Sequence, residues 1–156
     1  MSALKRLRRA LPIFSITLLA AISARSASEP DPSIMAFKLP DKIQWSPATG
    51  RGPQTAVLYG DPKKAGELYI VLTKWPPHSM SRPHFHPNDR YITVLEGTWW
   101  VGWGPKYDPD STYPMPKGSF VQHFGKKIHY DGAKDSECIL EIVGMGPDTL
   151  TSAEQK

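Results

Sequence analysis

Short runs of β-branched and aromatic residues, separated by turns, make up most of this chain after its first 50 residues. No window has the sustained 3.6-residue period of an amphipathic helix. Sixteen prolines and twelve glycines among 156 residues also disfavour a helix bundle, because both residues interrupt helices. Strands are expected at residues 55–59, 68–75, 91–95, 98–103, 119–124 and 138–143. Short strands at regular spacing predict an all-β sandwich or barrel.

Turn residues and the single cysteine add detail to this expectation. Breaks between strands are expected at Gly60-Asp61-Pro62, Pro76-Pro77, Glu96-Gly97, Pro116-Lys117-Gly118 and Asp131-Gly132. A single cysteine, Cys138, excludes an internal disulfide and a multi-cysteine zinc site. It alternates with Leu140 and Ile142 along the last expected strand, so we expect a buried structural thiol.

The first 28 residues have the pattern of a secretory signal peptide. Four basic residues within 5–9 precede an apolar stretch of 15 residues at 10–24, and small residues follow as far as Ser28. An uncleaved anchor is the alternative, but a membrane-spanning helix needs about 20 residues. We therefore expect cleavage after Ser26 or Ser28, a periplasmic or secreted protein, and no stable membrane anchor after cleavage.

The excess of basic charge belongs to this same segment. The whole sequence has a net charge of +4, but residues 1–28 hold five of its 19 basic residues and none of its 15 acidic ones. Their removal leaves 14 basic and 15 acidic residues, a net charge of −1. We expect no nucleic-acid partner, because binding to a phosphate backbone depends on an excess of Lys and Arg.

The rest of the sequence is long enough for one domain. Residues 29–40 are rich in Pro and polar residues and are expected to form a flexible lead-in. Residues 41–147 contain no internal repeat, low-complexity tract or linker. We therefore expect a single domain over 41–147, followed by a C-terminal tail at 148–156.

All five histidines lie between residues 78 and 129. His84 and His86 are two positions apart, so on an extended strand they point to the same side. They can then present two imidazoles to one metal ion, although surface strands also carry such pairs by accident. His129 comes from a later expected hairpin, and ligands from separated strands can converge at the mouth of a barrel.

The surroundings of these histidines resemble the two sequence motifs of the cupin superfamily. The first motif has a His-x-His pair, an acid and a glycine, and here His84, His86 and Gly97 match it. The second has a glycine, a short strand, a turn and a histidine, and here Gly118 and His129 match it. The resemblance implies a single-domain cupin β-barrel, also called a double-stranded β-helix or jelly roll. It implies His84, His86 and His129 as ligands of a divalent ion, with Fe, Zn, Ni, Mn and Cu not distinguished.

Two departures from the cupin pattern affect the expected ligands. The resemblance covers residues from about 76 to 132, but Arg90 stands where the family usually has a glutamate ligand. A β-bulge could bring Asp89 into that place, because one register step exchanges the two faces of a strand. The turn before the last ligand reads Phe124-Gly125-Lys126 rather than Pro-x-Gly, which suggests a shifted loop. His123 is the other candidate fourth ligand, or else a packed strand residue.

Arg90 has two interpretations. If it points inward, its charge adds to that of an ion held by neutral imidazoles, and the pocket attracts an anionic oxygen of a substrate. If it points outward, it forms a surface ion pair and the site binds metal weakly or not at all, because a cation beside an ion is unfavourable. Arg90 and Tyr130 are the candidate catalytic residues, Tyr130 because it lies next to His129 in the sequence.

The resemblance implies an exported, metal-binding cupin whose partner is a small molecule. Its three-histidine site is similar to the iron sites of some cupin dioxygenases. Oxygenase chemistry, or cleavage of a C–C or C–O bond in a small oxygen-bearing substrate, is the leading hypothesis. A non-catalytic periplasmic cupin that binds or senses a small ligand or metal is the alternative, and a structural barrel with an inactive site is a third. A homodimer is also expected, because small barrels tend to cover their open strand edges.

Overall fold

The structure is a computed structural model that describes residues 28–155, so the predicted signal peptide lies outside the described residues except for Ser28. The chain divides into two units, 1–36 and 37–156. Regular structure in the second unit consists of β1 (Gln54–Tyr59), β2 (Leu68–Trp75), β3 (Ser79–Met80), β4 (His84–Phe85), β5 (Arg90–Glu96), β6 (Thr98–Trp103), β7 (Tyr113–Pro116), β8 (Phe120–His123), β9 (His129–Ala133), β10 (Cys138–Met145), β11 (Thr151–Ser152) and the 3-10 helices η1 (Pro40–Lys42) and η2 (Pro109–Ser111). Among the described residues, no helix has the length and apolar character needed to cross a membrane.

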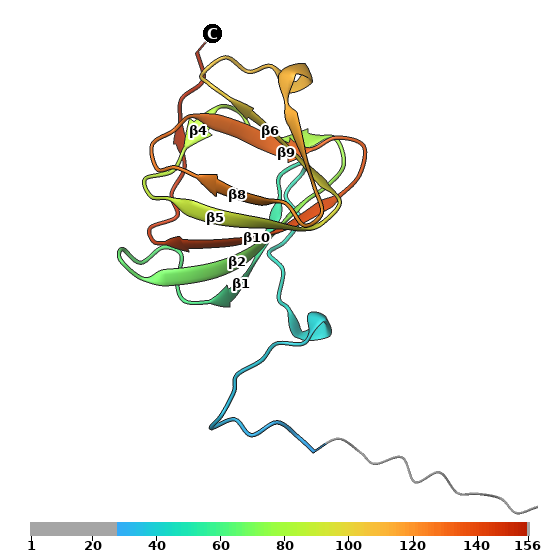
Figure 1. Cartoon of the computed structure of the whole chain (residues 1–156), viewed down its shortest axis with the longest axis vertical. Coiled ribbons are helices and arrows are strands. Elements are labelled where there is room, and N and C mark those ends of the chain that lie inside the picture. The colour runs from blue at the N-terminus through green and yellow to red at the C-terminus, as the bar shows by residue number, and fades with distance from the viewer. Residues whose placement is uncertain (1–27, 156) are drawn as a thin grey trace, which may run out of the picture. The chain divides into compact units, whose positions relative to one another are not determined.

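Two antiparallel sheets form this unit (Figure 1). One has the strand order β1-β2-β10-β5-β8, and the other has the order β11-β4-β9-β6-β7, with β3 paired to β9. Strands far apart in the sequence are neighbours: β2 pairs with β10 along its whole length, from Leu68↔Met145 to Trp75↔Cys138. The all-β prediction is confirmed.

The core lies between the two sheets and follows the two-residue period of their strands. Along β10, the residues Cys138, Leu140 and Ile142 are buried, while the residues between them are partly exposed. The expected buried thiol is confirmed, and burial raises the pKa of Cys138 to about 12. The other buried members of the core come from both sheets: Tyr69, Val71, Trp75, Ile92, Val94, Trp99, Val101 and Ala133.

Strands β7 and β9 lie outside the six strand ranges predicted from the sequence. β7 contains Pro114 and Pro116. Prolines are tolerated there because β7 is the edge strand of its sheet. The predicted break at Asp131-Gly132 is wrong, since both residues lie inside β9. A Cβ on Gly132 would lie 2.1 Å from the carbonyl oxygen of Ser79 in β3. This glycine marks a close approach of two strands rather than a turn.

The last described residues are paired with the sheet that carries His84. β11 pairs with β4 through Thr151↔Phe85 and Ser152↔His84. The backbone N–H of Ala153 also donates to the carbonyl of Pro83 at 2.9 Å. The segment predicted as a tail therefore supports the strand from which the histidine pair begins.

Candidate metal centre

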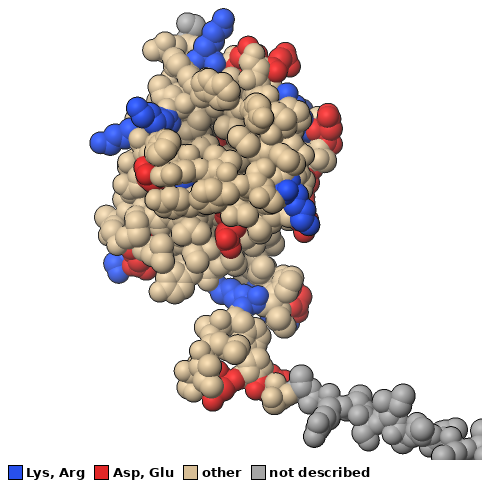
Figure 2. Space-filling model, viewed as in Figure 1, with Lys and Arg blue, Asp and Glu red and all other residues tan. Residues whose placement is uncertain are grey.

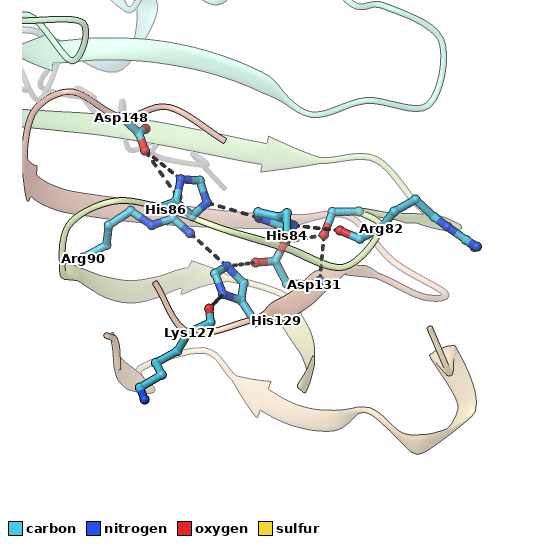
Figure 3. A network of polar contacts seen from close by, with 9 residues as sticks. Arg82, His84, His86, Arg90, Lys127, His129, Asp131 and Asp148 are labelled. Carbon is cyan, nitrogen blue, oxygen red and sulfur yellow. Dashed lines mark hydrogen bonds and ion pairs between the residues drawn. The ribbon is translucent and has the colours of Figure 1, made fainter. Parts of the chain in front are cut away.

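Three imidazoles converge between the sheets. His84 begins β4, His86 follows that strand, and His129 begins β9. The two strands pair through His84↔His129, which brings the third histidine beside the pair. All three side chains are buried, and one ring nitrogen from each lies within 4.8 Å of the others (Figure 3). The structure thus brings together the three residues that the sequence predicted as ligands.

Backbone carbonyls fix the orientation of two of the rings. Nδ1 of His84 lies 2.8 Å from the carbonyl oxygen of Arg82, and Nδ1 of His129 lies 3.0 Å from that of Lys127. A carbonyl oxygen can only accept a hydrogen bond, so each Nδ1 carries the proton and donates it. The neutral ring then keeps its lone pair on Nε2, which is the atom left to bind a metal ion.

The third ring lies beside a carboxylate, although the contact lacks hydrogen-bond geometry. Nδ1 of His86 lies 3.2 Å from Oδ1 of Asp148, as a metal-binding imidazole often contacts an outer carboxylate. Its Nε2 is 3.1 Å from Nε2 of His84. Two imidazoles on one divalent ion, each at about 2.1 Å, place their nitrogens roughly 3.0–3.4 Å apart. The donor set therefore fits a divalent metal ion.

Burial favours the neutral, metal-binding form of His84 and His129, and also of His123. Burial is the main cause of the lowered pKa of His84. In the same way burial lowers the pKa of His129 to about 4 and that of the neighbouring His123 to about 3. The nearby guanidinium of Arg90 lowers all three further, and Asp131 opposes the change only in part.

Arg90 points into the barrel. Along β5, Arg90, Ile92 and Val94 alternate onto the same buried face. Its Nη2 is 3.4 Å from Nε2 of His129, and its Nη1 is 3.6 Å from Oδ1 of Asp148 (Figure 3). Of the two interpretations of this residue, the structure shows the inward one. The guanidinium contacts the same nitrogen of His129 that a metal ion would use.

Two other candidates lie away from the cluster. Asp89 is exposed, and its carboxylate accepts hydrogen bonds from the backbone N–H of Gly125 at 2.7 Å and from Nε2 of Gln122 at 3.0 Å. No bulge turns it inward, because β5 and β8 pair in regular register. The Tyr130 hydroxyl donates to the carbonyl of Asp108 at 2.9 Å, and alternation along β9 places its ring on the face opposite the cluster. The structure gives both side chains structural contacts instead of a place at the site.

His123 lies beside the three histidines. Its ring centroid is 4.0 Å from that of His129, and its Nδ1 is buried without a hydrogen-bond partner among the described residues. His123, His129 and Asp131 form a second group whose ligand atoms lie within 4.8 Å of one another. Sequence reasoning missed Asp131, because the Asp131-Gly132 pair has the composition of a turn. Residues two positions apart on a strand point to the same side, and this applies to His129 and Asp131 as it does to His84 and His86.

Asp148 is the second residue that sequence reasoning missed. It lies beyond β10, in the segment predicted as a tail, and it contacts both His86 and Arg90. Burial alone would raise the pKa of Asp148, but His86, Arg90 and Tyr69 together hold it below its ordinary value. No local pattern points to this residue, because its partners come from strands distant in the sequence.

A cavity of about 460 Å³ opens beside the centre. Its polar lining includes His84, His86, Arg90, Asp131 and Asp148. Its apolar wall includes Val71, Trp75, Trp99, Leu140 and Ile142. A mostly apolar pocket with a few convergent polar groups is typical of sites for small molecules.

No protein-family model matches this sequence, and no curated protein matches it. The polyketide cyclase RemF from Streptomyces resistomycificus aligns with a TM-score of 0.62 at 17% identity, over 78% of this chain and 87% of that one. A protein with a double-stranded β-helix domain from Klebsiella pneumoniae aligns with a TM-score of 0.57 at 17% identity, over 77% and 97%. A cupin-2 domain protein from Rhodospirillum rubrum aligns with a TM-score of 0.57 at 13% identity, over 75% of this chain and 78% of that one. These similarities show the fold: the chain is a double-stranded β-helix.

Proposed function

We propose that this protein is an exported cupin enzyme that holds a divalent metal ion through His84, His86 and His129. The observation that carries the proposal is the convergence of three imidazoles whose Nδ1 atoms face oxygens, which leaves their Nε2 atoms to face one another. A bound divalent ion supplies Lewis-acid chemistry, and iron or copper also supplies redox chemistry. The proposed reactions are oxidation, or cleavage of a C–C or C–O bond, in a small oxygen-bearing substrate.

Arg90 supports a substrate with an anionic group. Its guanidinium is buried at the cavity, between His129 and Asp148. A planar guanidinium holds a carboxylate through two parallel hydrogen bonds. A substrate carboxylate at this place would draw the guanidinium away from Nε2 of His129. The apolar wall around Trp99 would exclude water from the rest of the bound molecule.

Other observations fit an enzyme for small molecules. RemF, which shares the fold, is a polyketide cyclase. Basic and acidic side chains are interspersed on the face of the molecule in Figure 2, which supports a small-molecule partner over nucleic acid. Export stays a prediction from residues 1–28, and the homodimer stays a prediction from the cupin resemblance.

The metal content of the purified protein tests the first part of the proposal. After chelation and reconstitution with Fe²⁺, Ni²⁺, Co²⁺, Zn²⁺, Mn²⁺ or Cu²⁺, we expect about one ion per chain. The variants His84→Ala, His86→Ala and His129→Ala should each lose most of this binding, while His78→Ala, at an exposed histidine outside the cluster, should keep it. Absence of stoichiometric metal in the wild type, or its retention in all three variants, would overturn the proposal.

Turnover by the reconstituted protein distinguishes an enzyme from a binding protein. Oxygen consumption and product formation are measured across diketones, thiols and phenolic acids, with the metal-free protein as control. We expect metal-dependent turnover of an anionic member of the panel, with a higher KM for that substrate in Arg90→Ala. Saturable binding of a panel member without turnover would instead support the non-catalytic cupin.

A further inference from the structure

The cavity contains a buried carboxylate that lacks a cationic partner within residues 28–155. Asp131 is 5% exposed and lies on β9, two positions after His129. Its Oδ1 is 3.3 Å from the hydroxyl of Ser81, and its Oδ2 is 3.9 Å from Nε2 of His129. Figure 3 shows this carboxylate between the rings of His84 and His129.

Among the described residues, Asp131 forms no ion pair with an Arg or Lys side chain. The guanidinium of Arg90 makes its ion pair with Asp148 at 3.6 Å, so these two side chains offset each other. Nε2 of His129, at 3.9 Å, is beyond hydrogen-bond distance of the carboxylate, and the hydroxyl of Ser81 is a neutral partner for a buried anion. A buried carboxylate is costly unless a cation or several hydrogen bonds accompany it. Lys63, the other cationic side chain that lines the cavity, is exposed. The buried carboxylate of Asp131 is therefore free of any Arg or Lys ion pair among the described residues and is open to a bound cation.

The position of Asp131 is also that of a metal ligand. Its carboxylate, His123 and His129 offer three ligand atoms within 4.8 Å of one another, and this group shares His129 with the three-histidine group. The buried Nδ1 of His123 has no hydrogen-bond partner in the described part of the chain. Imidazole nitrogens and carboxylate oxygens together form common sites for divalent transition metals.

We propose that Asp131 is the anionic ligand of this metal centre, the role that the cupin pattern gives to an acid at position 90. This inference rests on the proposed function, because it requires an ion at His129. His129 and Asp131 are two positions apart on β9, so the alternation of the strand points both side chains to the same side. The same spacing applies to His84 and His86. An ion with one carboxylate ligand keeps less net charge, and Arg90 stays available for the substrate.

The inference is tested by Co²⁺ titration of the metal-free protein, with the visible absorption of bound Co²⁺ as a readout of its ligand set. Asp131→Asn keeps the shape of the side chain but removes its charge. We expect it to weaken Co²⁺ binding by about tenfold or more and to change the Co²⁺ spectrum. Asp135→Asn, at an exposed aspartate just beyond β9, is the matched control and should bind as the wild type does.

The thermal midpoint of the metal-free variants shows whether Asp131 has a merely structural role. A ligand acts through the bound ion, so Asp131→Asn should lose most of the Co²⁺-induced shift in the thermal midpoint, whereas a merely structural residue would change the midpoint without Co²⁺ and leave the shift intact. If Asp131→Asn does not fold, Asp131→Glu, which keeps a carboxylate, replaces it, and its Co²⁺ spectrum should stay close to that of the wild type. Wild-type affinity and spectrum in Asp131→Asn would overturn this inference alone, whereas absence of Co²⁺ binding in the wild type would overturn the proposed function as well.

Discussion

Arg90 places a guanidinium at the candidate metal centre, in a position where the cupin pattern has an acidic ligand. Its two terminal nitrogens contact His129 and Asp148, so it holds one candidate ligand directly and a second, His86, through the carboxylate. Arg90 therefore lowers the affinity of the site for a cation, because it contacts the metal-binding nitrogen of His129 and repels the ion. The same charge gives the site a preference for an anionic ligand.

The substitution Arg90→Glu tests this account at the scale of the residue. We expect Co²⁺ affinity to rise about tenfold or more, because the change removes a cation from Nε2 of His129 and adds a carboxylate to the cavity. Isothermal titration with the metal-free protein measures the effect, and Arg90→Gln, which removes the charge alone, should give an intermediate value. Affinity equal to or below that of the wild type would show that Arg90 does not oppose the ion.

At the scale of the element, the site depends on how β9 is held. This strand pairs with β3, β4 and β6, and it carries both His129 and Asp131. Gly132 permits the pairing with β3, since any Cβ there would meet the backbone of Ser79 and Met80 at 2.1 and 2.6 Å. The position of the two polar side chains therefore depends on a glycine that contacts no ligand itself.

The substitution Gly132→Ala should separate β3 from β9. We expect a loss of about 1–3 kcal/mol in the free energy of unfolding, as for other overpacked sites. Co²⁺ affinity should fall too, because β9 carries His129. Urea unfolding measures the first effect, with Gly52→Ala as control, where a Cβ would meet its nearest atoms at an ordinary 3.4 Å. A variant as stable as the wild type would contradict the close packing of these strands.

At the scale of the whole molecule, the buried histidines couple folding to pH. The pKa values of His123 and His129, about 3 and about 4, lie below the 6.5 expected for the unfolded chain. Below pH 6.5 the unfolded state therefore binds more protons than the folded state, so the free energy of unfolding falls as the pH drops. The loss continues until the folded state is itself protonated near pH 4 and below.

The metal-free protein should consequently lose stability between pH 6.5 and pH 4, by at most about 1.4 kcal/mol per pH unit for each buried histidine. Urea unfolding in the presence of chelator, at several pH values across this range, measures the slope. His123→Phe should flatten the curve, while His78→Ala should leave it unchanged, because His78 is exposed. A flat wild-type curve would mean that these imidazoles are not buried in neutral form.

The features that follow from local alternation can be predicted from the sequence. All six expected strands are present, and those at 68–75 and 98–103 match to the residue. The shared side of His84 and His86 follows from spacing alone. The sequence leaves the direction of Arg90 open, because the predicted strand begins only at residue 91, and the structure places Arg90 on the buried face of β5. Such patterns are local because they depend only on the geometry of one extended strand.

The side chains that complete the site are brought together by packing between distant segments. Asp148 reaches His86 and Arg90 because the chain beyond β10 returns to the cavity, and no pattern near Asp148 encodes those partners. Asp131 could not be predicted as a site residue because Asp131-Gly132 has the composition of a turn. In the structure the pair lies within β9, where the close approach of β3 requires a glycine. Strand pairing and packing bring distant segments together, and their free energy depends on the whole chain rather than on any short stretch of it.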